Sequence, residues 1–234
     1  MTDVTTLLSK LETIVAEKSG TEECFYFRRC IRLLEQCLDY YIFDQGGRPR
    51  DRHMAENILA LRDLYAQRRF VLTSGNWHIS RVSIPIEGTD DYVTMGSILA
   101  DVLGEKYCAI GTAFCEGTYL GVAGDSSTND DVVVETHVPK SDTFEYSLNA
   151  FAKETASPNF MVDFRHNRLD IQPFPWPDTL RMNVGEAAPK QSYDATFLPQ
   201  RSERQFDGLL YLTKTTPITV LPDYYLYSRK KWGK

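Results

Sequence analysis

The chain has 234 residues, of which 42% are hydrophobic and 25% charged, proportions typical of a soluble globular protein with one domain or two small ones. Its net charge of −6 argues against nucleic-acid binding, which needs a basic surface to neutralise phosphates. No apolar run approaches the roughly 20 residues that cross a bilayer, so no membrane span is expected.

The cysteines indicate a reducing compartment. Their number is odd, no CxxC motif occurs, and the N-terminus lacks a secretory apolar segment. We therefore expect a cytoplasmic protein. Cys30 and Cys37 are seven residues apart in a helical pattern, which predicts that both pack as small apolar side chains.

The first third of the chain has apolar residues at helical spacing and predicts two to three helices. One stripe covers residues 4–15 and a second covers 27–41. A third, 54–65, belongs to a helix expected over 50–67. Met1 directly precedes the first stripe and its capping residues, so we expect the chain to begin at its own N-terminus.

From residue 68 the pattern changes to short β-branched and aromatic runs. RRFVLTS (68–74) predicts a buried strand, and a loop follows to Tyr92. A helix begins near Met95 and stops at Gly104, and another begins at Ser141 or Asp142. Further strands are expected over 107–114, 118–123, 131–138, 159–165 and 206–217.

Strands separated by helices predict an α/β fold with a mostly parallel sheet and flanking helices. The whole chain, 1–234, is expected to form a single domain. It would consist of a helical part (1–67), a sheet-containing part (68–221) and a basic tail (222–234). The Pro-rich and polar segment 167–205 predicts a long ordered loop across the top of the sheet.

The stretch TSGNWHISR follows the first predicted strand, at the carboxyl edge where ligands bind in parallel sheets. His78 suits proton transfer or water activation, Asn76 offers an amide donor for an oxyanion, and Arg81 offers a fixed charge. Alternatively, Gly75 and Asn76 form a turn, and Trp77 and His78 simply pack the loop that follows.

GRPRDRHMAEN (47–57) gathers charged residues at a helix entry. Arg50 and Asn57 are seven apart and share one helical face, and Asp51 favours the helix dipole, although a solvated helix start explains the same residues. Glu116 follows the strand at 107–114 and lies at a second carboxyl edge. No histidine has a companion at metal-ligand spacing, and the chain lacks HExxH, GxSxG and glycine-rich nucleotide motifs.

Four stretches in one order resemble the erythromycin esterase family: RDRHMAEN, RRFVLTSGNWHISR, VTMGSILADVLGEKYCAIGTAFCEGTY and FDGLLYLTKTTP. The resemblance covers about residues 25–221. The positions that match the family patterns are Arg50, Asp51, Met54, Ala55, Asn57, Met95, Gly96, Tyr107, Ile110, Gly111, Phe206, Asp207 and Gly208.

The resemblance implies an α/β hydrolase that opens a macrolide lactone with histidine-activated water, without a metal, a cofactor or a serine nucleophile. His78 matches the second histidine of the family's strand-end motif, Asn76 its asparagine and Arg50 the family arginine. Gly75 stands where the first histidine belongs. The chain matches only the C-terminal half of the family and lacks its N-terminal Gly-Glu-x-x-His-Gly motif.

The first hypothesis is therefore a metal-independent hydrolase acting on an ester, lactone or amide of a small natural product, such as an antibiotic or another secondary metabolite. We expect His78, Arg50 and Glu116 to be catalytic, and Asn76, Trp77, Arg81 and Asn57 to bind substrate. A partner chain would supply the missing half in a hetero-oligomer or homo-oligomer, because a half-domain exposes a sheet edge. Alternatively, the site has been rebuilt in this chain.

Two alternatives stay open. The chain is a non-catalytic binding or structural subunit descended from that family, which the loss at Gly75 favours. Or the helices before Arg50 replace the lost half and complete a repurposed enzyme.

Overall fold

The computed structural model describes residues 2–17, 22–40, 49–65, 68–86, 88, 90–122, 131–136, 138–165, 179–181, 197–199 and 202–217. The helices are α1 (Thr2–Glu17), α2 (Glu22–Leu38), α3 (Pro49–Leu64), α4 (Asn76–Ile79), α5 (Met95–Leu103), the 3₁₀ turn η2 (Gly104–Lys106), α6 (Phe144–Glu154) and α7 (Ser202–Gln205). The strands are β1 (Ile110–Val122), β2 (Asp131–Thr136), β3 (Asn159–Asp163), β4 (Thr179–Arg181), β5 (Phe197–Pro199) and β6 (Gly208–Thr215).

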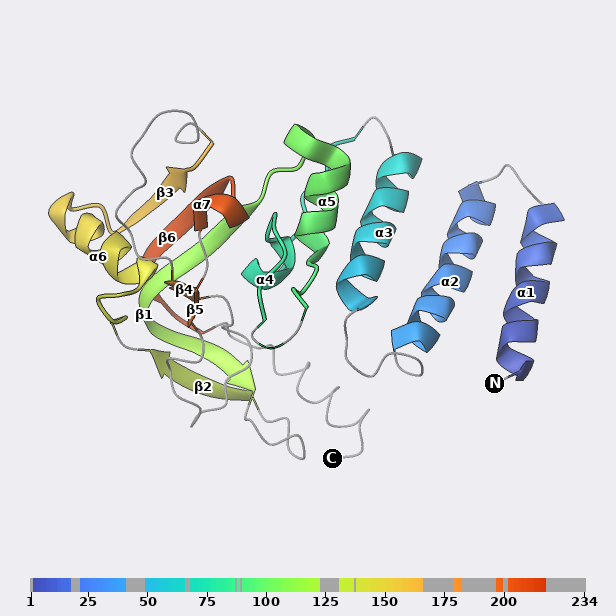
Figure 1. Ribbon diagram of the computed structural model, residues 1–234, viewed down its shortest axis with the longest axis horizontal. Coiled ribbons are helices and arrows are strands. Elements are labelled where there is room, and N and C mark those ends of the chain that lie inside the picture. The colour runs from blue at the N-terminus through green and yellow to red at the C-terminus, as the bar shows by residue number, and fades with distance from the viewer. Residues whose placement is uncertain are drawn as a thin grey trace.

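The N-terminal helices stand in a row that leads to the sheet (Figure 1). α1 packs on α2, α3 packs on α5, and the short α4 lies between α5 and β1. The α3–α5 contact is apolar and centres on Ala55, Met95 and Leu99, each at most 2% exposed. The expectation of two to three helices before residue 67 is confirmed by α1, α2 and α3.

The main sheet has four strands in the order β2-β1-β6-β3. β1 and β6 run parallel, whereas the outer pairs β1–β2 and β3–β6 are antiparallel. The α/β class is confirmed, but the sheet is mixed and not mostly parallel. The two edge strands join their neighbours in the opposite sense, as occurs in many larger α/β sheets.

One strand replaces the two that the sequence predicts over 107–114 and 118–123. β1 pairs with β6 up to Gly117 and with β2 from Gly117 onward, so the two runs form one strand. Gly117 has a φ of +126°, and a Cβ there would lie 2.2 Å from the carbonyl oxygen of Thr215. Only glycine fits where β1 passes from one partner to the other.

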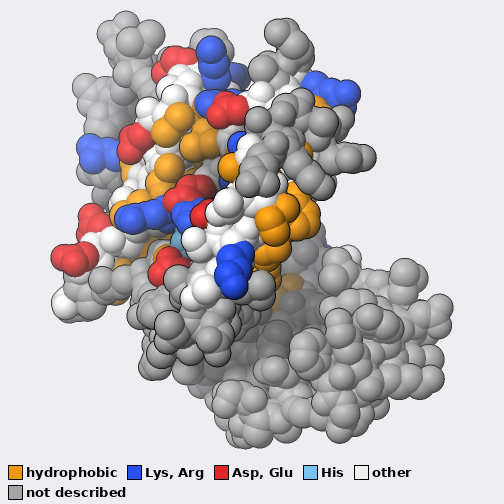
Figure 2. Space-filling model, turned by 90° about the vertical axis from the view of Figure 1, so that its right-hand side faces the viewer, with side chains coloured by type: hydrophobic (Ala, Val, Ile, Leu, Met, Phe, Trp, Pro, Cys, Tyr) orange, Lys and Arg blue, Asp and Glu red, His pale blue; other side chains and the backbone are white. Residues whose placement is uncertain are grey.

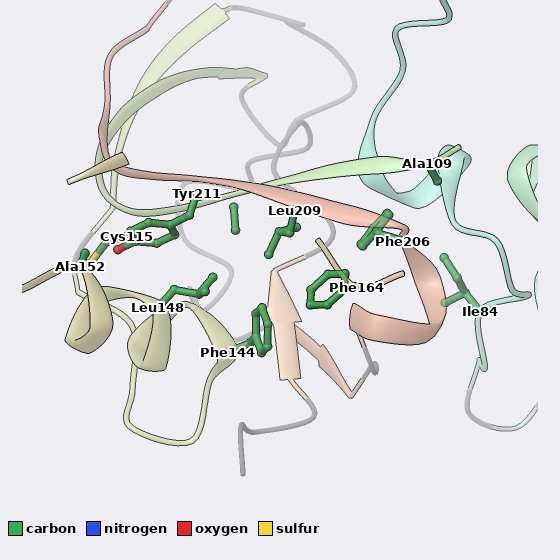
Figure 3. Packing of buried hydrophobic residues seen from close by; sticks show 11 residues of the cluster. Ile84, Ala109, Cys115, Phe144, Leu148, Ala152, Phe164, Phe206, Leu209 and Tyr211 are labelled. Carbon is green, nitrogen blue, oxygen red and sulfur yellow. The ribbon is translucent and has the colours of Figure 1, made fainter. Parts of the chain in front are cut away.

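The main core lies between the sheet and α6 (Figure 3). β6 alternates in the manner of a half-buried strand: Leu209 and Tyr211 are fully buried, whereas Leu210 is 38% exposed. From α6, Phe144 and Leu148 meet these side chains. The helix begins after Thr143, whose side-chain oxygen accepts a hydrogen bond from the Tyr146 amide, and not at Ser141 or Asp142 as expected.

Three further predictions need correction. Residues 68–74 form neither a ladder nor a helix, so the buried strand expected there is absent from the described chain. The segment 167–205, where described, contains the β4–β5 pair and α7. Cys30 and Cys37 are exposed, and none of the five cysteines is in a disulfide.

The basic tail 222–234 lies outside the described residues, as do His137 and His166. Among the described helices none has the length and apolar character needed to cross a membrane.

Candidate functional site

A buried carboxylate holds the histidine of the TSGNWHISR stretch. The Nδ1 atom of His78 lies 2.7 Å from Oδ1 and 2.9 Å from Oδ2 of Asp51. The Asp51 side chain is fully buried, whereas that of His78 is 21% exposed. The pair joins the first turn of α3 to the short helix α4, which are separated by more than twenty residues of sequence.

Two other donors fix the Asp51 carboxylate. The Tyr92 hydroxyl donates to Oδ1 over 3.0 Å, and the backbone amide of Met95, the first residue of α5, donates to Oδ2 over 2.8 Å. A helix N-terminus favours a negative charge at this position. Burial, together with the neighbouring Asp51 charge and this hydrogen bond, raises the pKa of Tyr92 to about 12, so its phenol keeps the proton that it donates.

Close packing of α5 against α4 sets this geometry. A Cβ on Gly96 would lie 2.4 Å from the carbonyl carbon and oxygen of Ile79, so only glycine allows the two backbones to approach. The Thr94 hydroxyl donates to the Ser80 carbonyl over 2.7 Å and also caps α5 by accepting from the Ser97 amide. The end of α4 is thereby fixed to the start of α5, which carries the Met95 amide.

This arrangement defines the proton positions on the imidazole. The Asp51 carboxylate accepts every hydrogen bond that it makes, so Nδ1 of His78 is the donor and carries the hydrogen. Nε2 of the neutral ring then has a free lone pair. A partly exposed imidazole with a carboxylate on its other nitrogen is the arrangement of a general base that takes a proton from water.

Arg50 and Trp77 lie beside the pair. Arg50 is exposed and adjoins Asp51 in the first turn of α3, and its positive charge acts on the pKa of the Tyr92 phenol in the direction opposite to burial. The Trp77 ring packs edge-on against Tyr92, with 5.4 Å between ring centroids. Of the predicted site residues, His78 contacts Asp51 directly, Trp77 packs on the Tyr92 ring that donates to Asp51, and Arg50 precedes Asp51 in the chain.

Asn76 is held by the sheet. Its Nδ2 donates to the Thr112 carbonyl over 2.6 Å and its Oδ1 accepts from the Thr112 amide over 2.9 Å. The side-chain amide therefore pairs with the open side of β1 as a neighbouring strand would. This contact anchors the start of α4 and so positions His78, two residues later.

Arg81 makes structural contacts. Its Nη1 donates to the Tyr107 carbonyl over 2.5 Å and to Oδ2 of Asp207 over 2.8 Å. The side chains of Arg81 and Asp207 are nearly buried. Desolvation also raises the pKa of the Tyr107 phenol, which donates to the Ile79 carbonyl. Arg81 thereby ties the end of α4 to the strand starts of β1 and β6.

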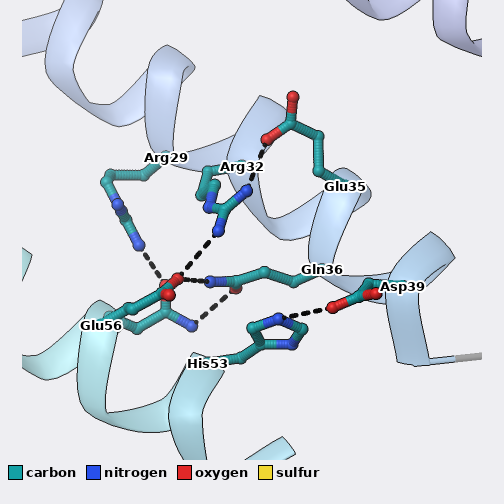
Figure 4. Close-up of polar contacts among 8 residues, drawn as sticks. Arg29, Arg32, Glu35, Gln36, Asp39, His53 and Glu56 are labelled. Carbon is teal, nitrogen blue, oxygen red and sulfur yellow. Dashed lines mark hydrogen bonds and ion pairs between the residues drawn. The ribbon is translucent and has the colours of Figure 1, made fainter. Parts of the chain in front are cut away.

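A polar layer lies between α2 and α3 (Figure 4), and the hydrogen bonds of Asn57 make it part of this layer. Its Oδ1 accepts from Arg29, and its Nδ2 donates to Gln36 over 3.0 Å. Glu56 accepts from Arg32 and Gln36, both over 3.0 Å. None of the contacts described for Asn57 links it to His78.

Glu116 lies farther along β1. It stands four residues beyond Thr112, roughly 13 Å along a strand, and opposite Lys214 of β6. Among the described residues, no group of three or more His, Cys, Asp or Glu side chains could hold a metal ion.

The sequence places Asp51 at the start of a helix, where it favours the helix dipole and matches the family pattern, but it does not predict the contact with His78. It predicts Tyr92 only as the end of a loop. The signal for Asp51 was its position beside Arg50 in the RDRHMAEN stretch, whereas Tyr92 gave none, because its contact depends on the Ile84–Tyr92 bridge that folds the loop back.

Comparisons with known proteins agree with this architecture. The family model described as erythromycin esterase matches residues 1–215. Erythromycin esterase type II of Escherichia coli is 21% identical over 179 residues, which cover 76% of this chain and 39% of that protein.

Solved structures with the same fold include a Bacillus cereus protein (TM-score 0.71, 18% identity), covering 94% of this chain and 52% of that one. A succinoglycan biosynthesis protein has a TM-score of 0.65 at 18% identity, with 89% and 49% covered. A mutant of the erythromycin esterase EreC in its open conformation has a TM-score of 0.62 at 16% identity, with 90% and 51% covered. The chain spans about half the length of these relatives.

Proposed function

The chain belongs to the erythromycin esterase family, and we propose that it is a hydrolase-type protein in which His78 activates water against an ester, lactone or amide of a small natural product. The observation that carries the proposal is the contact between Nδ1 of His78 and the buried Asp51 carboxylate, at 2.7 Å. A carboxylate in this position orients the ring and stabilises the imidazolium that forms during proton transfer.

The proposed reaction uses one water molecule. Nε2 of His78 removes a proton from the water, whose oxygen bonds to the substrate carbonyl carbon. The tetrahedral intermediate then collapses with cleavage of the C–O or C–N bond to the leaving group. The imidazolium gives its proton to the departing oxygen or nitrogen, so that a carboxylic acid and an alcohol or amine are formed. The exposed guanidinium of Arg50 is the nearby positive charge for the oxyanion, and Trp77 provides an apolar wall.

The remaining predicted residues have supporting parts in this proposal. Asn76 and Arg81 position α4 through Thr112 and Asp207, and Asn57 supports the middle of α3 from the side of α2. Glu116, which the sequence predicts to be catalytic, stays a candidate for that role farther along β1. Because the chain spans about half of its relatives, we expect the remaining half of the family fold to complete the pocket.

The test is hydrolysis of p-nitrophenyl esters and of a macrolide lactone, with the chain alone and with the complementary half of a relative added. We expect His78→Ala and Asp51→Asn each to lower turnover by about 10²-fold or more. His53→Gln is the matched control, because His53 lies on α3 as Asp51 does, and it contacts a carboxylate, that of Asp39, at 3.0 Å as His78 contacts Asp51. Equal turnover in wild type, His78→Ala and Asp51→Asn would contradict the proposal.

A second candidate function is binding without catalysis. The observation in its favour is Gly75, three residues before His78: glycine has no functional group, and a Cβ added there meets no described atom within 4 Å. In that case, a ligand would shift the imidazole NMR signals of His78 while no product forms under any of the assay conditions.

A further inference from the structure

Residues 69–74 have the composition of a strand but pair with no strand among the described residues. The segment, RFVLTS, is rich in β-branched and aromatic residues and connects α3 to α4. Within the described chain, main-chain hydrogen bonds begin only at its two ends, where the Arg68 amide donates to Tyr65 and the Gly75 carbonyl accepts from His78. No other described residue makes a main-chain hydrogen bond to the peptide groups between these ends, so within the described chain they can accept a neighbouring strand.

The side chains of this segment are exposed on both sides. Phe70, Val71 and Leu72 are consecutive, with exposed fractions of 49%, 97% and 45%. A strand with one buried face alternates apolar and polar residues, whereas a continuous apolar run is typical of a strand covered on both faces. The segment therefore has the sequence of a strand that pairs with a neighbouring strand and is covered by an apolar layer on each face.

The main sheet has an open face of the same kind. Leu210 of β6 is paired with Met161 of β3, and both are exposed, at 38% and 53%, on the side opposite α6. Ile110 of β1 is also 47% exposed. Apolar side chains reach the surface over the N-terminal helices as well, where they lie among charged groups (Figure 2). A single added strand would leave these surfaces uncovered.

We propose that residues 69–74 form a β-strand that pairs with a strand of the complementary half of the family fold. The chain spans only 39% of the E. coli erythromycin esterase type II and 49–52% of the solved structures, so that half is what the relatives have in addition. A symmetric pair of two copies of this segment would cover the main-chain edge but leave Phe70, Val71 and Leu72 exposed on their faces.

The docked half would lie next to the candidate site. Residue 74 precedes Gly75 and α4, so a strand beside 69–74 brings the complementary half to the partly exposed ring of His78. The inference does not depend on hydrolysis, because a binding subunit would use the same strand.

The experiment combines co-expression with hydrogen exchange. The chain is produced alone and with a tagged segment of E. coli erythromycin esterase type II that lies outside its match to this chain. We expect the amides of 69–74 to exchange freely in the chain alone and at least 100-fold more slowly in a one-to-one complex. Val71→Lys should weaken the complex at least tenfold, and the control Val102→Lys, on α5 and 55% exposed, should not.

Three outcomes would overturn the inference: no complex, equal weakening by both lysine variants, or slow exchange at 69–74 in the chain alone, including in a dimer of two copies. A complex with protected 69–74 amides but no hydrolysis supports this docking and contradicts only the proposed activity. Hydrolysis by the chain alone, without a complex, supports the proposed activity and contradicts this docking.

Discussion

At the residue scale, the Asp51 carboxylate depends on groups outside the histidine pair. Three donors converge on its two oxygens, and each side chain or amide comes from a different element: His78 of α4, Tyr92 of the returning loop and Met95 of α5. A fully buried carboxylate without such donors would be costly, since its charge is no longer solvated. The hydrogen bonds keep it an acceptor, which in turn fixes the tautomer of His78.

Tyr92→Phe tests this support. The change removes a hydrogen bond to a buried charge, so we expect a loss of about 1.5–3 kcal/mol in the free energy of unfolding at pH 7. The folded-state pKa of Tyr92, about 12, lies above its ordinary value of 10. The tyrosine's contribution is therefore complete below pH 10 and is lost as the pH rises toward 12.

The measurement is urea unfolding of both proteins at pH 7, 10 and 12. The difference between wild type and Tyr92→Phe should shrink between pH 10 and 12, while other tyrosines with a raised pKa, such as Tyr211, affect both proteins alike. A difference that stays constant across this range would show that Tyr92 does not donate to Asp51.

At the element scale, alanine substitutions at two glycines distinguish the effect of close packing on stability from the effect of backbone conformation. Gly96→Ala would place a methyl group 2.4 Å from the Ile79 backbone, so α5 must move away from α4. We expect a loss of about 1–3 kcal/mol in unfolding free energy, measured by urea denaturation, and weaker hydrolysis where it occurs.

Gly75→Ala is the control, because its φ of −67° suits alanine and its Cβ meets open space. It should be neutral or stabilising by about 0.4–1 kcal/mol; equal effects at both glycines would contradict the packing argument.

The α2–α3 contact is polar where most helix contacts are apolar. Asn57→Ala leaves two groups, the Arg29 guanidinium and the Gln36 amide oxygen, without the partner shown here. We expect a loss of about 1–3 kcal/mol in unfolding free energy. Asp63→Ala, which breaks an exposed ion pair with Arg62, should change stability by about 0.5 kcal/mol or less. If Asn57 instead contacts substrate, its variant would impair ligand binding at unchanged stability.

The sequence predicts an element correctly where neighbouring residues determine that element, and less well where long-range contacts determine it. The helix at Met95 and its end at Gly104 follow from local spacing and a C-terminal glycine, and both are confirmed. The direction of the outer strands was wrong because pairing sense depends on long-range connections that no local pattern records. The composition of residues 69–74 predicts a strand. A strand must pair with a neighbour, and the described chain does not supply one.

At the scale of the whole molecule, Asp207 links the site to the sheet. Its Oδ2 accepts from Arg81 and from the Ala109 amide, both over 2.8 Å, and its backbone carbonyl accepts from the Phe164 amide at the end of β3. The entry to β1, the entry to β6 and the exit of α4 therefore meet at one carboxylate. The sequence pointed to Arg81 as a substrate charge because it follows His78, and only the folded chain reveals its distant partner.

Arg81→Ala should therefore act on the whole fold. It leaves the Asp207 carboxylate, whose side chain is 5% exposed, without its cation, and breaking a buried pair from one side costs about 3–5 kcal/mol. In Asp207→Asn the amide oxygen still accepts from Ala109, so we expect a smaller loss, and the double variant should be less destabilised than the sum of the two. Urea unfolding of the four proteins measures this coupling. Additive effects would contradict the coupling between Arg81 and Asp207. An Arg81→Ala variant with wild-type stability but without ligand binding would support the predicted substrate contact instead.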